Sequence, residues 1–269
     1  MSELLDAVDA ALIAHHEPSI VLATLRATTS LASLLGSIRA DASRLKILAD
    51  RSYRHHNGFD KIVLASPASS PLKLVLHVWP RGGAADANDI HDHRWDFASV
   101  VLCGALRVEL YEPDVSGRSY SVMRYRPMPG AENYDLQPSG TMAVSAQASV
   151  TITVGSAYSW AADLLHRAWG LPGQTTATLI VQGPPTRAST TVLARTPDAR
   201  RLADGGRLLH QLRADEVDNT LAALTRGKAH TAWQLPGPQV PAQRSSGSSI
   251  RDWPHSEGAE NAAKLLISE

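Results

Sequence analysis

This chain of 269 residues has few cysteines, no surplus of either charge and no long apolar run, and each of these absences excludes a structural feature or a partner. Cys103 is the single cysteine, so an internal disulfide is excluded. The 26 basic side chains cancel the 26 acidic ones, which leaves no cationic surplus to attract nucleic-acid phosphates or an anionic lipid surface. No apolar run approaches the roughly 18 residues of a membrane-spanning helix. We therefore expect neither a nucleic-acid partner nor a membrane.

We also expect no secretory signal, because Glu3, Asp6 and Asp9 interrupt the basic and apolar segments that a signal peptide needs. With a single thiol, this predicts a cytoplasmic protein. The apolar share of 43% and the charged share of 19% are typical of globular chains, so wholesale disorder is excluded. At about 150 residues per domain, the length fits one large domain with appendages or two small ones.

The hydrophobic spacing divides the chain into four segments. Apolar residues recur at helical spacing in 1–50, which predicts a helical lead-in that packs on the second segment. In that second segment, nine short runs rich in Val, Leu, Ile and Thr predict an antiparallel sandwich or barrel over 51–196. Helical spacing returns in 197–233, the predicted helical extension. The segment 234–269 is rich in Pro and Ser, and we expect a flexible tail with a short terminal helix.

Histidine is unusually frequent, with 11 residues against two phenylalanines. His91 and His93 stand two apart at the start of a strand run. Because side chains alternate between the faces of a strand, both imidazoles point the same way, about 6.6 Å apart, and Asp92 points oppositely. His166 lies beside later strand runs, where closure of a barrel would bring it near. A bare His-x-His is a weak signal, and a scaffold barrel without metal would make the three histidines coincidental.

These segments resemble the cupins, and among cupins they are most similar to cysteine dioxygenase and its relatives. The resemblance is carried by IHDH at 90–93 with Gly104 after it, and by Tyr158 ahead of LLHRAW at 164–169 and TATLIVQGPP at 176–185. It covers roughly half of the chain. It implies a mainly β fold, a cupin-type antiparallel β-barrel (jelly roll), to which the spacing adds a helical N-terminal segment and a helical C-terminal extension.

The resemblance also implies that His91, His93 and His166 hold a non-haem ferrous ion, Fe(II). Three neutral ligands leave the ion its full charge and open positions for an anionic substrate, with O2 as co-substrate. The implied activity is a cysteine dioxygenase-like oxygenase acting on a small thiol- or amino-acid-like carboxylate. The common cupin pattern has a glutamate four or five residues after the second histidine, whereas this chain has Phe97 and Ala98. We therefore expect no fourth ligand at these positions.

Three residues near the ligands are expected to support them. Asp96 is the nearest carboxylate, and we expect it to hold an imidazole or an arginine in place rather than to bind the metal. Trp95 and Trp169 flank the two ligand segments, where indoles would keep water from a metal centre. Aromatic packing alone would also account for both.

Three further residues are expected to contact the substrate. Arg54, next to a tyrosine as in the family, is the candidate clamp for a substrate carboxylate, with Arg51 as its substitute. Tyr158 is a candidate hydrogen-bond partner for bound oxygen. His77 alternates with apolar neighbours in LKLVLHVW, and we expect it to face the barrel interior.

An alternative is a non-redox cupin that binds a small ligand or sugar, or an isomerase-type enzyme that uses Zn or Mn. Imidazole suits several divalent metals, so the histidines do not decide between them. In either case we expect a small-molecule partner and a monomer or homodimer. The remaining histidines, His55 and His56 among them, are expected at the surface.

Overall fold

The computed structural model describes residues 3–55, 57–80, 88–127, 134–194 and 210–226, together with Trp233. All of these belong to one structural unit, Met1–Leu235. A second unit, Pro236–Glu269, lies outside the described residues, and so do the predicted tail and the segment 195–209. The predicted boundaries between the four segments stay predictions.

The described residues form five helices, which are α1 (Glu3–Ala14), α2 (Pro18–Thr28), α3 (Leu31–Arg39), α4 (Ala42–Ala49) and α6 (Ala214–Arg226). Polar caps begin two of them. Ser30 accepts a hydrogen bond from the backbone N–H of Ser33 at the start of α3. Asp41 accepts from the N–H groups of Ser43 and Arg44 at the start of α4. In this part of the chain, no helix alone has the length and apolarity to cross a membrane; α2 and α3 reach both only as a pair bent by 87°.

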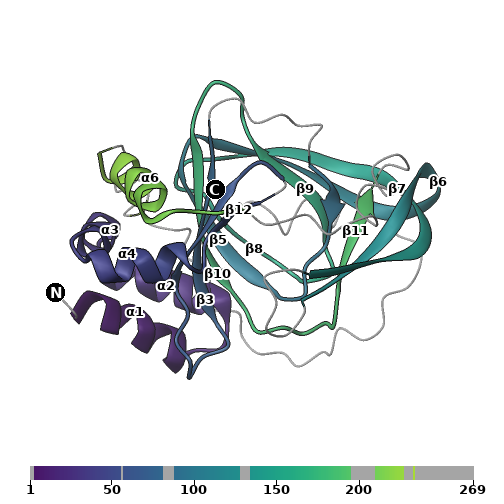
Figure 1. Ribbon diagram of the computed structural model, residues 1–269. Helices are drawn as coiled ribbons and strands as arrows, with labels where there is room; N and C mark the ends of the chain where they lie inside the picture. The colour runs from purple at the N-terminus through teal and green to yellow at the C-terminus, as the bar shows by residue number, and fades with distance from the viewer. Residues whose placement is uncertain are drawn as a thin grey trace, which may run out of the picture. The chain divides into compact units, whose positions relative to one another are not determined.

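The strands form two antiparallel sheets (Figure 1). The strands are β1 (Tyr53–Arg54), β2 (Asp60–Ala65), β3 (Lys73–Trp79), β4 (Ile90–His91), β5 (Phe97–Cys103), β6 (Ala105–Pro127), β7 (Tyr134–Thr153), β8 (Ala157–Trp160), β9 (Leu165–Gly170), β10 (Thr176–Gln182), β11 (Thr190–Ala194) and β12 (His210–Gln211). One sheet has the order β12-β1-β2-β3-β10-β5-β8 and the other β11-β4-β9-β6-β7, and β11 also pairs with β6. The expected class, a mainly β antiparallel barrel with helices before and after it, is confirmed.

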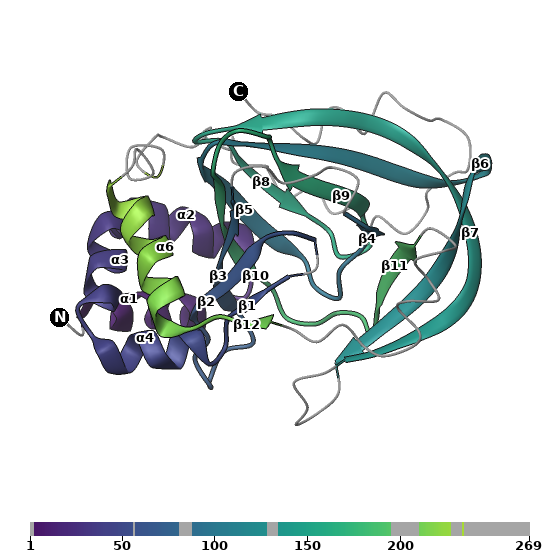
Figure 2. The same cartoon turned by 45° about the horizontal axis from the view of Figure 1, so that its top comes forward.

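Two of the strands are longer than the sequence pattern indicates. The runs ALRVELYE and YSVMRYR both lie in β6, and TMAVS and all but the last residue of SVTITV lie in β7. The intervening PDVSG does not end the strand, because the register with β7 shifts between Pro113 and Arg118 and the excess residues are taken up there. The result is a long β6–β7 hairpin that runs along the side of the barrel away from the helices (Figure 2).

The seven-stranded sheet separates the helices from the space between the sheets (Figure 1). Because side chains alternate along β3, Leu74, Leu76 and Val78 pack in the core shared with the helices. His77 and Trp79 face the other way and line a cavity between the sheets. Each fully buried aliphatic side chain stabilises the fold by about 1.5–3 kcal/mol relative to exposure. The helices therefore secure one face of the sheet and leave its other face free to form a site.

Candidate metal centre

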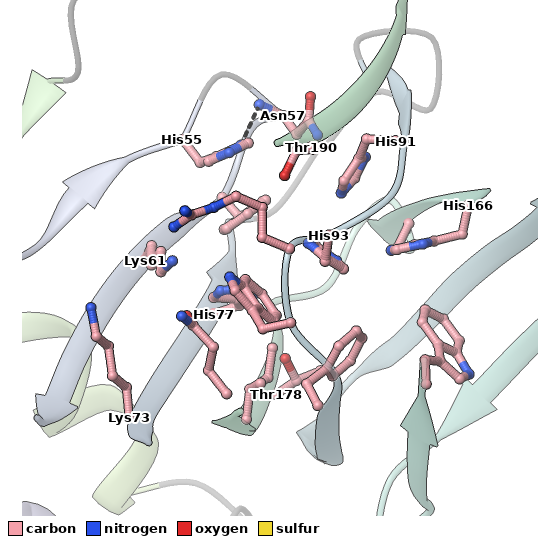
Figure 3. Close-up of a pocket in the computed structure, with 18 of the residues that line it drawn as sticks. His55, Asn57, Lys61, Lys73, His77, His91, His93, His166, Thr178 and Thr190 are labelled. Atoms are coloured by element: carbon pink, nitrogen blue, oxygen red, sulfur yellow. Dashed lines mark hydrogen bonds between the residues drawn. The ribbon is translucent and has the colours of Figure 1, made fainter. Parts of the chain in front are cut away.

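Strand pairing brings three histidines together between the sheets (Figure 3). β4 pairs with β9 in a register that makes His91 and His166 direct cross-strand partners. His93 follows β4, and its backbone N–H donates to the carbonyl of Ala162 at 2.8 Å. One ring nitrogen of each histidine lies within 4.8 Å of the others, and no carboxylate or thiol joins the cluster in the described part of the chain. The structure thus assembles the predicted trio.

Backbone carbonyls orient two of the rings. Nδ1 of His91 lies 2.9 Å from the carbonyl oxygen of Asp89, and Nδ1 of His166 lies 2.9 Å from that of Leu164. A carbonyl only accepts hydrogen bonds, so these Nδ1 atoms carry the proton. The Nε2 lone pairs of both rings then remain for a metal ion, which is the usual arrangement around metal-bound histidines.

Burial keeps the three imidazoles neutral. It lowers the pKa of His166 to about 3 and that of His93 well below its ordinary value, and neighbouring histidines act in the same direction. Burial also lowers the pKa of His91. Metal ligation requires neutral imidazole, so the donor set fits a divalent ion. Metal–nitrogen bonds of about 2.0–2.1 Å require ligand atoms roughly 3–4 Å apart, so the rings must turn slightly inward on binding.

The two acids beside the ligands have different contacts. Asp92 points away from the two histidines beside it, as the alternation predicts, and its Oδ1 accepts from the N–H of Thr191 at 2.5 Å. The expectation that Asp96 holds an imidazole or an arginine is wrong, because its Oδ1 accepts from the backbone N–H of Ala162 at 2.7 Å. Asp96 therefore fixes the chain segment whose carbonyl accepts from the N–H of His93.

The histidines open into a cavity of about 540 Å³. Aromatic side chains from both sheets line it, namely Tyr53, Phe59, Trp79, Trp95, Phe97, Tyr125, Tyr158 and Trp160. Trp95 stacks on His93 with ring centroids 4.3 Å apart, and the edge of Trp160 meets His166 at 4.8 Å. Trp169 lies outside the wall, contrary to expectation. On β9 it alternates with His166 and so faces away from the cavity, against the guanidinium of Arg167 at 5.5 Å.

The predicted substrate-contact residues divide into two groups. His77 and Tyr158 line the cavity. Burial raises the pKa of Tyr158 to about 12, so its phenol stays protonated and can donate. Arg54 does not reach the cavity, because the preceding Tyr53 faces inward and successive residues of a strand face opposite ways. Its Nε lies 2.8 Å from Asp60 Oδ1 and its side chain is 51% exposed. The substitute, Arg51, does line the cavity.

Sequence reasoning missed several wall residues. His55, expected at the surface, stacks on Phe59 with ring centroids 4.5 Å apart inside the cavity, whereas His56 lies outside the described residues. Lys61 and Lys73 also line it. Strand alternation could have placed Lys73 in the cavity wall, because it shares a face of β3 with His77. Lys61 is the cross-strand partner of His77, and this pairing places it in the same wall.

No family model and no curated protein matches the sequence. Solved structures that match part of this chain include KdgF from a Halomonas species, with 16% identity and a TM-score of 0.29 over 49% of this chain and 86% of that one. Hydroquinone 1,2-dioxygenase PnpCD, solved with Cd2+, has 14% identity and a TM-score of 0.28 over 45% and 61% of the two chains. Oxalate decarboxylase from Bacillus subtilis has 14% identity and a TM-score of 0.29 over 50% and 27%.

This chain therefore covers less than two thirds of the length of the last two proteins. At this level of similarity, the overlap says nothing of what this chain binds.

Proposed function

We propose that this chain is a ferrous oxygenase of the cysteine dioxygenase-like type, which uses O2 to oxidise a small thiol- or amino-acid-like carboxylate. The observation that carries the proposal is the convergence of three neutral imidazoles, from His91, His93 and His166, on the inside of an aromatic-lined cavity. No carboxylate shares that cluster among the described residues, so an anionic substrate would meet an ion of undiminished charge.

The three histidines would hold the ion, and Fe(II) bound there would supply oxygen activation. Trp95 and Trp160 pack against two of the rings and keep bulk water from that end of the cavity. Tyr158 keeps its proton at neutral pH and is placed to donate a hydrogen bond into the cavity.

The cavity also suits a small ligand. Its volume of about 540 Å³ lies within the usual range of roughly 300–1,000 Å³ for small-molecule sites. Trp79, Trp160 and Thr178 in its wall each have a buried side-chain N–H or O–H with no hydrogen-bond partner among the described residues. Buried donors of this kind are usually satisfied, so we expect a bound molecule or water to accept from them.

Nitric oxide, a stand-in for O2, provides the test. The full chain is loaded anaerobically with Fe(II), treated with nitric oxide, and followed by electron paramagnetic resonance while small thiols and amino acids are added. We expect an iron–nitrosyl signal that changes with at least one compound, and O2 consumption with the same compound.

The His93→Ala variant should lose the signal, and the His210→Ala variant, which changes an exposed histidine on β12, should keep it. A signal indifferent to every compound, with no O2 uptake, would overturn the proposal and favour the non-redox alternative with Zn or Mn.

A further inference from the structure

Four cationic side chains line the same cavity as the three histidines. They are Arg51, Lys61, Lys73 and Arg94. Arg51 and Lys73 are exposed, whereas Lys61 and Arg94 are half-buried. In Figure 3, Lys61 and Lys73 lie on neighbouring strands at the side of the pocket away from His166. The cavity therefore has a metal-binding end and a cationic end.

Within the described part of the chain, these cations have no acidic partner. None of the four forms an ion pair among the described residues, whereas Arg54 pairs with Asp60 at 2.8 Å. Asp89, the one carboxylate in the described wall, lies beside His91, whose ring bonds its carbonyl oxygen. The rings of Tyr53 and Trp95, each 5.8 Å from the Lys61 ammonium, offer cation–π contacts that leave the charge in place.

Burial and the neighbouring cations both disfavour the charged form of the two lysines. Burial, together with the charge of Arg94, lowers the pKa of Lys61 to about 8. Burial also lowers the pKa of Lys73, and the charged neighbours that act on it, Lys61, Arg94 and Arg51, all act in the same direction. Gathering like charges in a partly desolvated wall is costly, and an anion bound between them would offset that cost.

We propose that the cationic end binds the head group of the ligand, and that this head group has two or more negative charges, as in a phosphate, a phosphonate or a pair of carboxylates. A single carboxylate would balance only one of four cations. Arg94 directly follows the metal-site residue His93, so an anion held there keeps the rest of the ligand within reach of the metal end. The proposal goes beyond the proposed function, because the head group need not be a carboxylate, and it rests on that function only for the claim that the ligand is the substrate.

Anion binding to the full-length chain, stripped of metal by a chelator, tests the subsite. Orthophosphate, malonate and acetate are titrated by calorimetry at equal ionic strength against sodium chloride. We expect saturable binding of orthophosphate or malonate, and binding of acetate weaker by about tenfold or more. The two dianions distinguish a phosphate-type head group from a pair of carboxylates.

Substitutions locate the site. Lys61→Met and Lys73→Met keep an unbranched side chain of similar length and remove its charge, and each should weaken dianion binding by about tenfold. Lys46→Met changes an exposed lysine on α4 and should leave it unchanged. The His166→Ala variant should lose metal but still bind the dianion, which excludes binding through a residual ion.

Two results would overturn the subsite: no dianion binding above the chloride control, or equal affinity in the wild type and both lysine variants. Acetate binding as tightly as the dianions would overturn the multiple charge. Failure of the nitric oxide experiment alone would remove the oxygenase and leave the anion site standing, so the two proposals can fail separately.

Discussion

Asp92 and Arg187 form an ion pair directly behind the metal-site histidines, with Oδ2 and Nη1 2.6 Å apart. The Asp92 side chain is only 4% exposed and stands in the chain between His91 and His93. The same Nη1 also donates to the carbonyl of His93 at 3.2 Å. The pair therefore fixes the backbone that carries two of the three candidate ligands.

Removing the guanidinium should weaken both the fold and the metal site. Arg187→Ala leaves a buried carboxylate without its cation, and we expect a loss of about 2–4 kcal/mol in the free energy of unfolding, measured by urea denaturation. Because the backbone of His93 loses a donor, iron affinity in chelator competition should fall about 10- to 100-fold.

The matched control is Arg213→Ala, which breaks a pair with Asp215 in which the side chains are 69% and 63% exposed. It should cost below about 1 kcal/mol. Equal losses in the two variants would contradict the role of the buried pair.

The histidine trio predicts a metal stoichiometry. The wild type should hold about one tightly bound divalent ion per chain, because three imidazoles form one site. His166→Ala removes one of three ligands, and metal content measured by plasma mass spectrometry should fall to a small fraction of that value. His210→Ala, the exposed-histidine control, should match the wild type. Full metal content in folded His166→Ala protein would show that the ion lies elsewhere.

Part of this site could be predicted from local pattern alone. The period of a strand places His91 and His93 on one face with Asp92 behind them, and the same period places His77 in the interior. It also shows why the resemblance misplaced an arginine. Arg54 follows Tyr53 on a strand, so the two side chains cannot both face one cavity. In β1 the tyrosine lines the cavity and the arginine faces away from it.

Other features depend on pairing across the sheets, which local pattern does not contain. That His166 is the direct partner of His91 follows from the β4–β9 register, and β4 is only two residues long. The cationic end depends on sheet order in the same way, since Lys61 and Lys73 come from adjacent strands. The sequence shows two separate lysines, and only the fold places both in the wall of one cavity.

The lowered histidine pKa values predict that the metal-free protein is sensitive to acid. In the folded chain His166 has a pKa of about 3, against an ordinary value of 6.5. Between these values the unfolded chain binds a proton on this ring that the folded chain does not, so falling pH favours unfolding. The midpoint temperature of chelator-treated protein should therefore drop as pH falls from about 6.5 toward about 3.

A variant isolates the contribution of this ring. His166→Leu removes one titrating group and should make the dependence shallower, with the lowered pKa values of His91 and His93 accounting for the part that remains, whereas His210→Leu should leave its slope as in the wild type. Added divalent metal competes with protons for the rings, so the decline should begin at a lower pH in the loaded protein. A slope unchanged in His166→Leu would contradict the assignment.

The turn between β5 and β6 gives the last prediction, because it requires a glycine for two reasons. Gly104 has φ of 70°, and a Cβ there would lie 2.5 Å from the carbonyl oxygen of Thr175. Gly104→Ala therefore combines backbone strain with a clash against fixed backbone, and we expect a loss of about 2–5 kcal/mol in the free energy of unfolding.

Gly173 is the matched control, since its φ is 80° but a Cβ there meets nothing within 4 Å. Gly173→Ala should then cost only the strain, about 1–2 kcal/mol. Urea denaturation of the two variants measures the difference. Equal losses would mean that the contact with Thr175 does not constrain the turn, and that backbone conformation alone accounts for the glycine.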